Sequence, residues 1–206
     1  EMVGEGINPA LIENAGKQLG MPTGPLAVGD EVSIELGHKI MLAARQQLGD
    51  AFVPQASDAV MEKMVNLGRL GRKNGKGWYD YPETGKKHLW GGLGDLFPRA
   101  AQQPDVEAVK ERLLYRQLIE CARSFEEGVL ATPEDGDIGA IFGWGFAPYT
   151  GGPFSHMDMI GAAQVVAVLD RLATAHGDRF APTAQLRDMA ASGATFYPAI
   201  SARKAA

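Results

Sequence analysis

Apolar residues recur with the 3.6-residue period of an amphipathic helix over much of the chain. From Ser33 to about Leu48 this period predicts a buried face made of Gly37, Ile40, Met41, Ala44 and Leu48. The opposite face, predicted to contact solvent, carries His38, Lys39, Arg45 and Gln46. A longer helix is predicted from about Asp105 to Leu130, with an apolar stripe at Leu114, Leu118, Cys121, Phe125 and Val129. Its exposed face is predicted to hold Arg112, Arg116, Glu120, Arg123 and Glu127.

Capping and turn residues predict where the other helices begin. Asn8-Pro9 has the form of an N-cap followed by proline at the first helical position, and Gly20 with Pro22 ends that helix. Thr132 is predicted to cap the helix that starts at Pro133. Further helices are predicted after Thr23-Gly24-Pro25 and over Ser57–Leu67, Gly161–Ala175 and Thr183–Ala191. Only Gly77–Tyr81 alternates like a strand, and it is too short to found a sheet, so the predicted fold class is all-α.

The chain contains an internal repeat with a constant offset. Gly24-Pro25-Leu26 with Asp30 returns as Gly152-Pro153-Phe154 with Asp158, an offset of 128 residues. Gly49–Pro54 returns as Gly177–Pro182 with the same offset, and Glu5-Gly6 returns as Glu127-Gly128 with an offset of 122. Chance matches would not share an offset over such a span, so we infer a duplicated helical module.

The segment between the copies, Gly68 to about Pro104, is rich in glycine and charge but contains spaced aromatic residues. A flexible linker would have few aromatic residues, so we expect an ordered crossover that packs on the helices. The predicted domains are residues 1–100, the first copy with its crossover, and residues 101–206, the second copy.

Composition narrows the function. The formal net charge of −5 is unlike that of a nucleic-acid-binding protein. The single cysteine, Cys121, rules out an internal disulfide and favours a reducing compartment. No stretch approaches the roughly 18 apolar residues of a membrane span. The first residues, Glu1–Gly6, include neither an initiator methionine nor a signal sequence, so we expect a piece of a longer protein.

Several motifs resemble one enzyme family. Glu5-Gly6, Ile12-Glu13, the run Gly20–Leu26 and Asp30-Glu31-Val32 resemble the C-terminal domain of 3-hydroxyacyl-CoA dehydrogenases. Gly71–Tyr81 is similar to the glycine-rich closing signature of that domain, and Gly143–Phe154 to the matching stretch of a second copy. Two copies in one chain, together with Lys86–Trp90, resemble the multifunctional α-subunits of fatty acid β-oxidation.

The resemblance implies a fold and a division of labour. The fold would be two tandem helical domains of the 6-phosphogluconate dehydrogenase C-terminal-like type, packed as a pseudo-dimer, with no Rossmann domain present. In this family an N-terminal Rossmann domain binds NAD and carries the catalytic His and Glu, but this chain has no G-x-G-x-x-G turn between a strand and a helix. We therefore assign no catalytic, cofactor-binding or metal residue here, and expect NAD in the missing N-terminal domain of the parent.

The parent enzyme implied by the resemblance oxidises (3S)-3-hydroxyacyl-CoA to 3-oxoacyl-CoA with NAD and is a bifunctional enoyl-CoA hydratase/dehydrogenase. The fragment alone is expected to be inactive. Its expected partners are the missing Rossmann domain, the acyl-CoA substrate, a thiolase β-subunit and further copies in a homo-oligomer. A bacterial cytoplasmic location is expected, with a mitochondrial or peroxisomal parent as the alternative.

The candidate substrate-binding residues are Met21, Pro22, Gly24, Pro25 and Leu26. The two prolines stiffen this stretch, the glycine permits close backbone approach, and Met21 and Leu26 offer apolar surface for an acyl chain. In the family this side of the domain faces the NAD domain. The alternative is a joint between helices that touches no substrate.

Other polar residues are interpreted as structural. His38 is expected to be a solvated helix residue rather than a base paired with Glu35, and His156 is expected to make a packing or water contact. The basic run Gly71–Gly77 lacks the spacing of a P-loop, and we expect a solvated turn rather than a site for coenzyme A phosphates. Asp30 and Asp158 are expected to hold backbone amides near the next helix. The competing function is an assembly module that binds a thiolase or a second α-subunit without contacting substrate.

Overall fold

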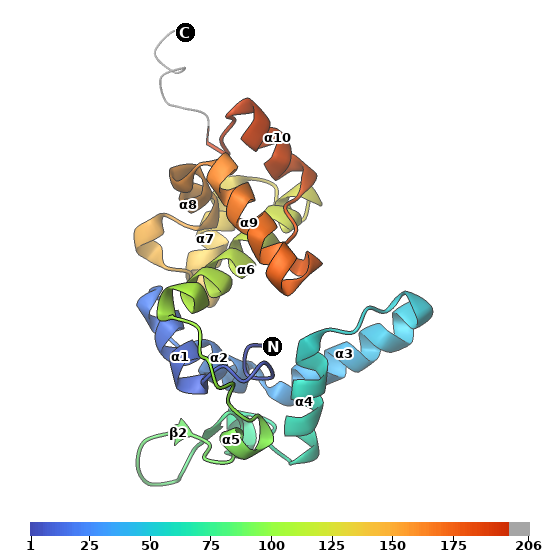
Figure 1. Ribbon diagram of the computed structural model, residues 1–206, viewed down its shortest axis with the longest axis vertical. Helices are drawn as coiled ribbons and strands as arrows, with labels where there is room; N and C mark the ends of the chain where they lie inside the picture. The colour runs from blue at the N-terminus through green and yellow to red at the C-terminus, as the bar shows by residue number, and fades with distance from the viewer. Residues whose placement is uncertain (198–206) are drawn as a thin grey trace. The chain divides into compact units, whose positions relative to one another are not determined.

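The computed structural model describes residues 1–197 and is almost entirely helical (Figure 1). Within those residues the strands are β1 (Tyr79–Asp80) and β2 (His88–Leu89), which pair antiparallel with Tyr79 opposite Leu89. The predicted all-α class is confirmed, because a two-stranded ribbon of this length forms no layer of its own. None of the described helices is long and apolar enough to cross a membrane.

The chain divides into two compact units, each described separately below. The first consists of residues 1–18 and 23–109, and the second of residues 19–22 together with the chain from Lys110 onward. These units are defined by packing. The ranges 1–100 and 101–206 come from the repeat and stay a prediction.

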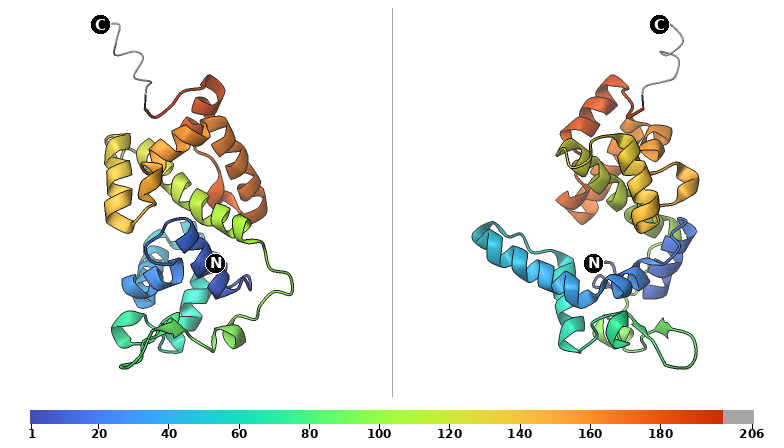
Figure 2. Two further views of the ribbon diagram at one scale, coloured as in Figure 1. Left: turned by 90° about the vertical axis from the view of Figure 1, so that its left-hand side faces the viewer. Right: turned by 180° about the vertical axis from the view of Figure 1, so that it is seen from behind.

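The first unit is a set of short helices followed by the crossover. Its helical elements are α1 (Pro9–Gln18), α2 (Pro25–Val32), α3 (Ile34–Leu48), η1 (Gly49–Ala51), α4 (Ala56–Asn66), η2 (Arg72–Asn74) and α5 (Leu93–Leu96). The Asn8 side chain accepts the Ala10 N–H at 3.1 Å, as the predicted N-cap requires. In both figures α3 and the segment after it project from the rest of this unit as a hairpin that returns into α4 (Figure 2).

The second unit is built on one long helix. Its elements are α6 (Val106–Glu126, which starts in the first unit), α7 (Pro133–Trp144), η3 (Pro148–Thr150), α8 (Pro153–Ile160), α9 (Ala162–His176), η4 (Asp178–Phe180) and α10 (Ala184–Ser192). Thr132 caps α7 through the Asp135 N–H at 3.1 Å. The core gathers side chains from α6, α8, α9 and α10, including Leu118, Phe154, Leu169 and Leu186. Burying each such side chain contributes roughly 1.5–3 kcal/mol.

The helices follow the offset found in the sequence. Adding 128 residues to α2 gives the bounds of α8, and adding 128 to α3 gives the bounds of α9. The same addition takes the first residue of α4 to the first residue of α10. The repeat therefore extends to the bounds of whole helices as well as to the amino-acid sequence.

The predicted burial is wrong at several positions. In α3, Ile40 and Leu48 are 60% and 52% exposed, because the neighbours of α3 in its unit, mainly α4 and α2, leave this face uncovered. Arg112, predicted on the exposed face of α6, is buried, and Val129 is exposed because α6 ends at Glu126. Periodicity identifies a face of a helix, whereas its burial depends on a partner.

Candidate functional site

A buried carboxylate on α1 organises the start of α2. Glu13 Oε1 accepts the backbone N–H groups of Leu26 at 2.5 Å and Ala27 at 3.3 Å. In the first turn of α2 these N–H groups have no acceptor within the helix, and the helix dipole also stabilises a negative charge there. The other oxygen, Oε2, accepts the hydroxyl of Tyr79 at 2.6 Å. Glu13 thus joins α1, α2 and the crossover.

The backbone at Gly24 makes room for this carboxylate. A Cβ atom placed on Gly24 would lie 2.3 Å from Oε2 of Glu13, far inside any real contact. Glycine is needed here for close approach, since the φ of Gly24 is −66° and any residue could adopt it. The proximity explains why glycine stands before Pro25 at the start of α2.

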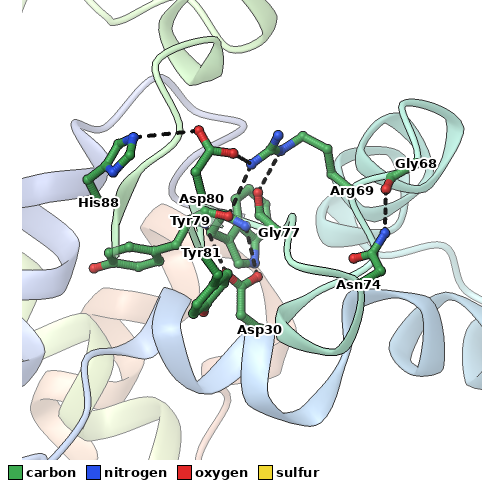
Figure 3. Close-up of polar contacts among 10 residues, drawn as sticks. Asp30, Gly68, Arg69, Asn74, Gly77, Tyr79, Asp80, Tyr81 and His88 are labelled. Atoms are coloured by element: carbon green, nitrogen blue, oxygen red, sulfur yellow. Dashed lines mark hydrogen bonds and ion pairs between the residues drawn. The ribbon is translucent and has the colours of Figure 1, made fainter. Parts of the chain in front are cut away.

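Asp30, on α2, fastens the crossover through its main chain. Its carboxylate accepts the N–H groups of Trp78 and Tyr79 at 2.8 and 2.9 Å and the Tyr81 hydroxyl at 3.0 Å (Figure 3). Asp30 therefore holds backbone amides as expected, but amides that lie 48 and 49 residues further along the chain rather than near the next helix. A Cβ on Gly77 would lie 1.9 Å from Asp30 Oδ1, so the close approach again requires glycine.

Arg69 holds the same crossover from its other side. The guanidinium donates to the carbonyl oxygens of Gly77 at 2.7 Å and Tyr79 at 3.1 Å, and to Asp80 Oδ1 at 2.7 Å (Figure 3). It also stacks 4.1 Å from the ring centroid of Trp90. Arg69 is 6% exposed, so these bonds are protected from water. The predicted ordered crossover is thereby held by named polar contacts.

The second unit repeats this arrangement. On α7, Asp137 accepts the N–H groups of Phe154 at 2.7 Å and Ser155 at 3.1 Å, at the start of α8, and the Tyr197 hydroxyl at 2.9 Å. On α8, Asp158 accepts the N–H groups of Phe196 and Tyr197, both at 2.9 Å. Each unit thus uses one carboxylate to cap a helix and a second to hold an aromatic dipeptide. We call the four residues Glu13, Asp30, Asp137 and Asp158 the clamp carboxylates.

The clamp is built for holding rather than for proton transfer. Burial raises the pKa of Asp30 above its ordinary value, although its three donors act in the opposite direction. Burial and the neighbouring carboxylate also raise the pKa values of Tyr79 and Tyr197, so both phenols stay protonated donors. Both oxygens of Glu13 and both of Asp30 already accept protein donors. A general base must reach a substrate proton, whereas these buried carboxylates are directed at protein donors.

The structure separates the candidate substrate-binding stretch into two parts. Gly24, Pro25 and Leu26 lie in the first unit, where Gly24 and Leu26 are buried by the Glu13 clamp. Met21 and Pro22 pack with the second unit, Met21 half-buried and Pro22 exposed. Tyr149 donates its hydroxyl to the Leu19 carbonyl at 3.2 Å and so anchors this segment.

Met21 lines a small cavity of about 30 Å³ together with Phe146, Tyr149 and His156. That volume holds about one water molecule and no acyl chain. His156 Nδ1 is buried there without a protein partner, and burial lowers the pKa of this imidazole, so the ring is neutral at physiological pH. Packing or a water contact at His156 stays the expectation, since its Nδ1 borders a cavity of the size of one water molecule.

The other candidates remain ordinary surface. Glu35 forms an ion pair with Lys39 at 2.7 Å, so its carboxylate is not dedicated to His38. In the basic run, Arg72 pairs with Glu31 at 2.5 Å, and Asn74 donates to the Gly68 carbonyl at 2.8 Å. Over residues 1–197, no group of His, Cys, Asp or Glu could hold a metal ion.

Sequence reasoning missed Glu13, Tyr79, Asp137, Tyr197 and Arg69 as the residues that organise the site. A signal existed for the two carboxylates, since Glu13 and Asp137 are related by an offset of 124, between the offsets already identified. The tyrosines are related by a different offset, 118, because the second copy reaches its aromatic dipeptide sooner. No local pattern marks Arg69, whose role depends on a turn formed later in the chain.

The comparisons with known sequences agree with the resemblance seen in the motifs. Residues 1–81 match the sequence model of the family "3-hydroxyacyl-CoA dehydrogenase, C-terminal domain". The chain is 43% identical over 198 residues to the fatty acid oxidation complex subunit alpha of Shewanella loihica and 42% identical over 192 residues to that of Shewanella amazonensis. These alignments cover 94% and 90% of the chain but only 27% and 26% of the relatives, so the chain spans about a quarter of their length.

Solved structures share the fold. A 3-hydroxybutyryl-CoA dehydrogenase from Escherichia coli K12 matches with a TM-score of 0.66 at 19% identity, over 93% of this chain and 57% of that one. The dehydrogenase part of multifunctional enzyme 1 from C. elegans matches with a TM-score of 0.61 at 17% identity, over 91% and 43%. Residues 1–81 are therefore similar to 3-hydroxyacyl-CoA dehydrogenase C-terminal domains, and the chain is similar to one part of the alpha subunit of fatty acid oxidation complexes.

Proposed function

We propose that the chain is the substrate-side and pairing part of an NAD-dependent 3-hydroxyacyl-CoA dehydrogenase, within a bifunctional enzyme of fatty acid β-oxidation. The observation that carries this proposal is the 43% identity to a fatty acid oxidation complex alpha subunit over 94% of the chain. A cytoplasmic location is part of the proposal and is supported by the bacterial source of that relative.

NAD does not fit the described residues. A dinucleotide site needs a parallel strand that turns through a glycine-rich loop into a helix, whose N-terminus faces the pyrophosphate. In residues 1–197 the strands are two residues long and antiparallel, and the glycine-rich run Gly71–Gly77 leads into β1 instead of a helix. NAD binding is therefore proposed for the N-terminal domain of the parent, and no chemical step is assigned to this chain.

The part proposed to face the acyl chain is the Met21–Pro22 segment with Pro25. The Glu13 clamp fixes the backbone at the start of α2, so Pro25 is held on a rigid support. Since the nearby cavity is too small for an acyl chain, the rest of the cleft is proposed to come from outside the described residues.

The test is Met21→Asp in the full-length enzyme, compared with Met159→Asp, which changes a methionine that is 70% exposed on α8. We expect Met21→Asp to raise KM for the acyl-CoA substrate with assembly intact, because a charge opposes acyl binding. Met159→Asp should leave KM unchanged. Equal KM values in the two variants would contradict the proposed acyl wall. NADH-linked turnover by the 206-residue chain alone would contradict the assignment of catalysis to the missing domain.

An assembly role is the second candidate, and a specific observation favours it. On α7, Ile138 and Phe142 are 59% and 85% exposed and lie one helical turn apart on the same face. At the offset of 124, the corresponding residues of α1 are Asn14 and Gln18, so only the second copy has this apolar surface. The proposed occupant is a thiolase subunit or a second alpha subunit.

Phe142→Asp in the full-length protein tests the assembly role by sedimentation velocity and steady-state kinetics. If α7 is an assembly surface, the variant should lose its partner while KM stays normal. An unchanged sedimentation coefficient, in the presence of the thiolase subunit, would count against this role. Met159→Asp again serves as the matched control for an added charge.

A further inference from the structure

The two copies differ in how one equivalent helix face is covered. With the offset of 128, Ile40 and Met41 of α3 correspond to Val168 and Leu169 of α9. Val168 and Leu169 are 6% and 0% exposed, whereas Ile40 is 60% exposed and Met41 is half-buried. Both faces are apolar, so the sequences of the two helices do not account for the difference. Among the described residues, the first copy has no element that covers this face of α3 as the face of α9 is covered in the second copy.

In the second unit, α6 contributes to the core in which this face of α9 is buried. Its residues Tyr115, Leu118, Ile119 and Ala122 join Val168 and Leu169 of α9 in one buried core. Polar contacts hold the same pair of elements, since Arg171 of α9 donates to Glu111 of α6 at 2.8 Å. Figure 1 and Figure 2 both show α6 running across this unit beneath α9. A helix that precedes α9 in the chain thus helps to bury its apolar face, together with α8 and α10.

The first residues of the chain reproduce the end of α6, bond for bond. Glu127 N–H donates to the Arg123 carbonyl, Gly128 to Phe125, and Val129 to Ser124, at 2.8, 3.0 and 2.9 Å. With the offset of 122, the matching bonds run from Glu5 to Glu1, Gly6 to Val3, and Ile7 to Met2, each at 3.0 Å. Gly128 and Gly6 also share the left-handed backbone of a helix C-terminus, with φ of 75° and 80°.

Taken together, these bonds give residues 1–7 the same backbone hydrogen-bond pattern as the turn that closes α6. We propose that in the full-length protein a helix running into Glu1 covers α3 as α6 covers α9, and so completes the first unit. The occupant of the exposed α3 face is therefore a segment of the same chain, in register with the repeat.

The register fixes which positions of that helix face α3. Subtracting 122 from the numbers of Ala122, Ile119, Leu118 and Tyr115 places their counterparts at the first, fourth, fifth and eighth residues before Glu1. These four positions are expected to be small or apolar, with charged residues between them. Arg123 corresponds to Glu1, whose carboxylate cannot donate the bonds that Arg123 gives to the carbonyls of Asp178 and Ala181, so we expect apolar packing to hold the proposed helix.

A photo-crosslink in the full-length protein tests the proposal. A benzophenone-bearing amino acid is placed at position 40, with position 159 as the control, since Met159 and its counterpart Glu31 are exposed in both copies. Mixing isotope-labelled and unlabelled protein separates crosslinks within one chain from crosslinks between chains. The expected product joins residue 40 to the roughly 25 residues before Glu1 of the same chain. Products with the second unit, with another chain or with a partner protein overturn the proposal, as does a yield no higher than that at position 159.

A stability measurement provides an independent check. Ile40→Asp in the full-length protein should lower the Tm, because a charge would replace an apolar contact with the proposed helix. Met159→Asp should leave the Tm near that of the unmodified protein. Equal Tm values for the two variants would overturn the proposal. Neither readout depends on dehydrogenase activity, so a failure here is distinguishable from a failure of the proposed function.

Discussion

Removing the carboxylate of Asp30 should free the crossover from α2. Asp30→Ala deletes the acceptor for two buried backbone N–H groups, those of Trp78 and Tyr79, and for the Tyr81 hydroxyl. A buried donor left without a partner costs about 1–3 kcal/mol. The two amides together therefore predict a loss of about 2–6 kcal/mol, while the half-buried Tyr81 hydroxyl can turn to water and adds little.

Amide hydrogen exchange in the full-length protein measures this loss locally. Because about 1.4 kcal/mol is a factor of ten, the amides of Trp78 and Tyr79 should exchange at least about 30-fold faster in Asp30→Ala. Asp158→Ala is the matched control, since it frees two amides that are only partly buried, and its effect on Phe196 and Tyr197 should be smaller. Protection of the Trp78 and Tyr79 amides that stays within threefold of the unmodified protein would refute the reasoning.

Three further predictions follow from the clamps and the core. Gly24→Ala should destabilise the first unit because its Cβ would press on Glu13, whereas Gly139→Ala, with open space around it in α7, should be neutral or stabilising by up to about 1 kcal/mol; chemical denaturation distinguishes them, and equal midpoints would contradict the contact. Because burial raises the pKa of Asp30, the folded protein binds this proton more tightly than the unfolded chain, so the free energy of unfolding should fall as pH rises from about 4 through the raised pKa. In a series of unfolding measurements at different pH values, the stability advantage of the unmodified protein over Asp30→Asn should become smaller across that window. An advantage that grows with pH would contradict the raised pKa. Burial raises the pKa of Cys121 to about 12, so alkylation by iodoacetamide at pH 8 should require unfolding; modification of the native protein at the rate of a free thiol would contradict this.

Local chemistry predicted the helix starts correctly. Asn8 and Thr132 each cap the helix that the sequence assigned to them, because an N-cap depends only on residues two or three positions away. The repeat offset likewise carried over to the bounds of α8 and α9. These features are visible in sequence because their causes are close together in the chain or are repeated along it.

Long-range polar contacts were not predictable in the same way. Tyr79 reaches Glu13 across 66 residues, and nothing in the letters between them indicates that pairing. The burial of α3 was overestimated for a related reason, since an apolar stripe shows which face can be covered but not whether a helix covers it. The candidate stretch Met21–Leu26 was found as one motif, whereas packing assigns its two ends to different units.

The clamp carboxylates that hold the aromatic dipeptides bind main-chain N–H groups, and every residue except proline supplies such a group. This contact therefore depends on spacing and backbone shape and not on the identity of the side chain, and the first aromatic residue is Trp78 in one copy and Phe196 in the other. Only the second residue, a tyrosine in both copies, also forms a side-chain hydrogen bond, in which its hydroxyl donates to a clamp carboxylate. Distant relatives of this domain should thus be easier to detect by an acidic residue and a tyrosine at variable separation than by any contiguous string of letters.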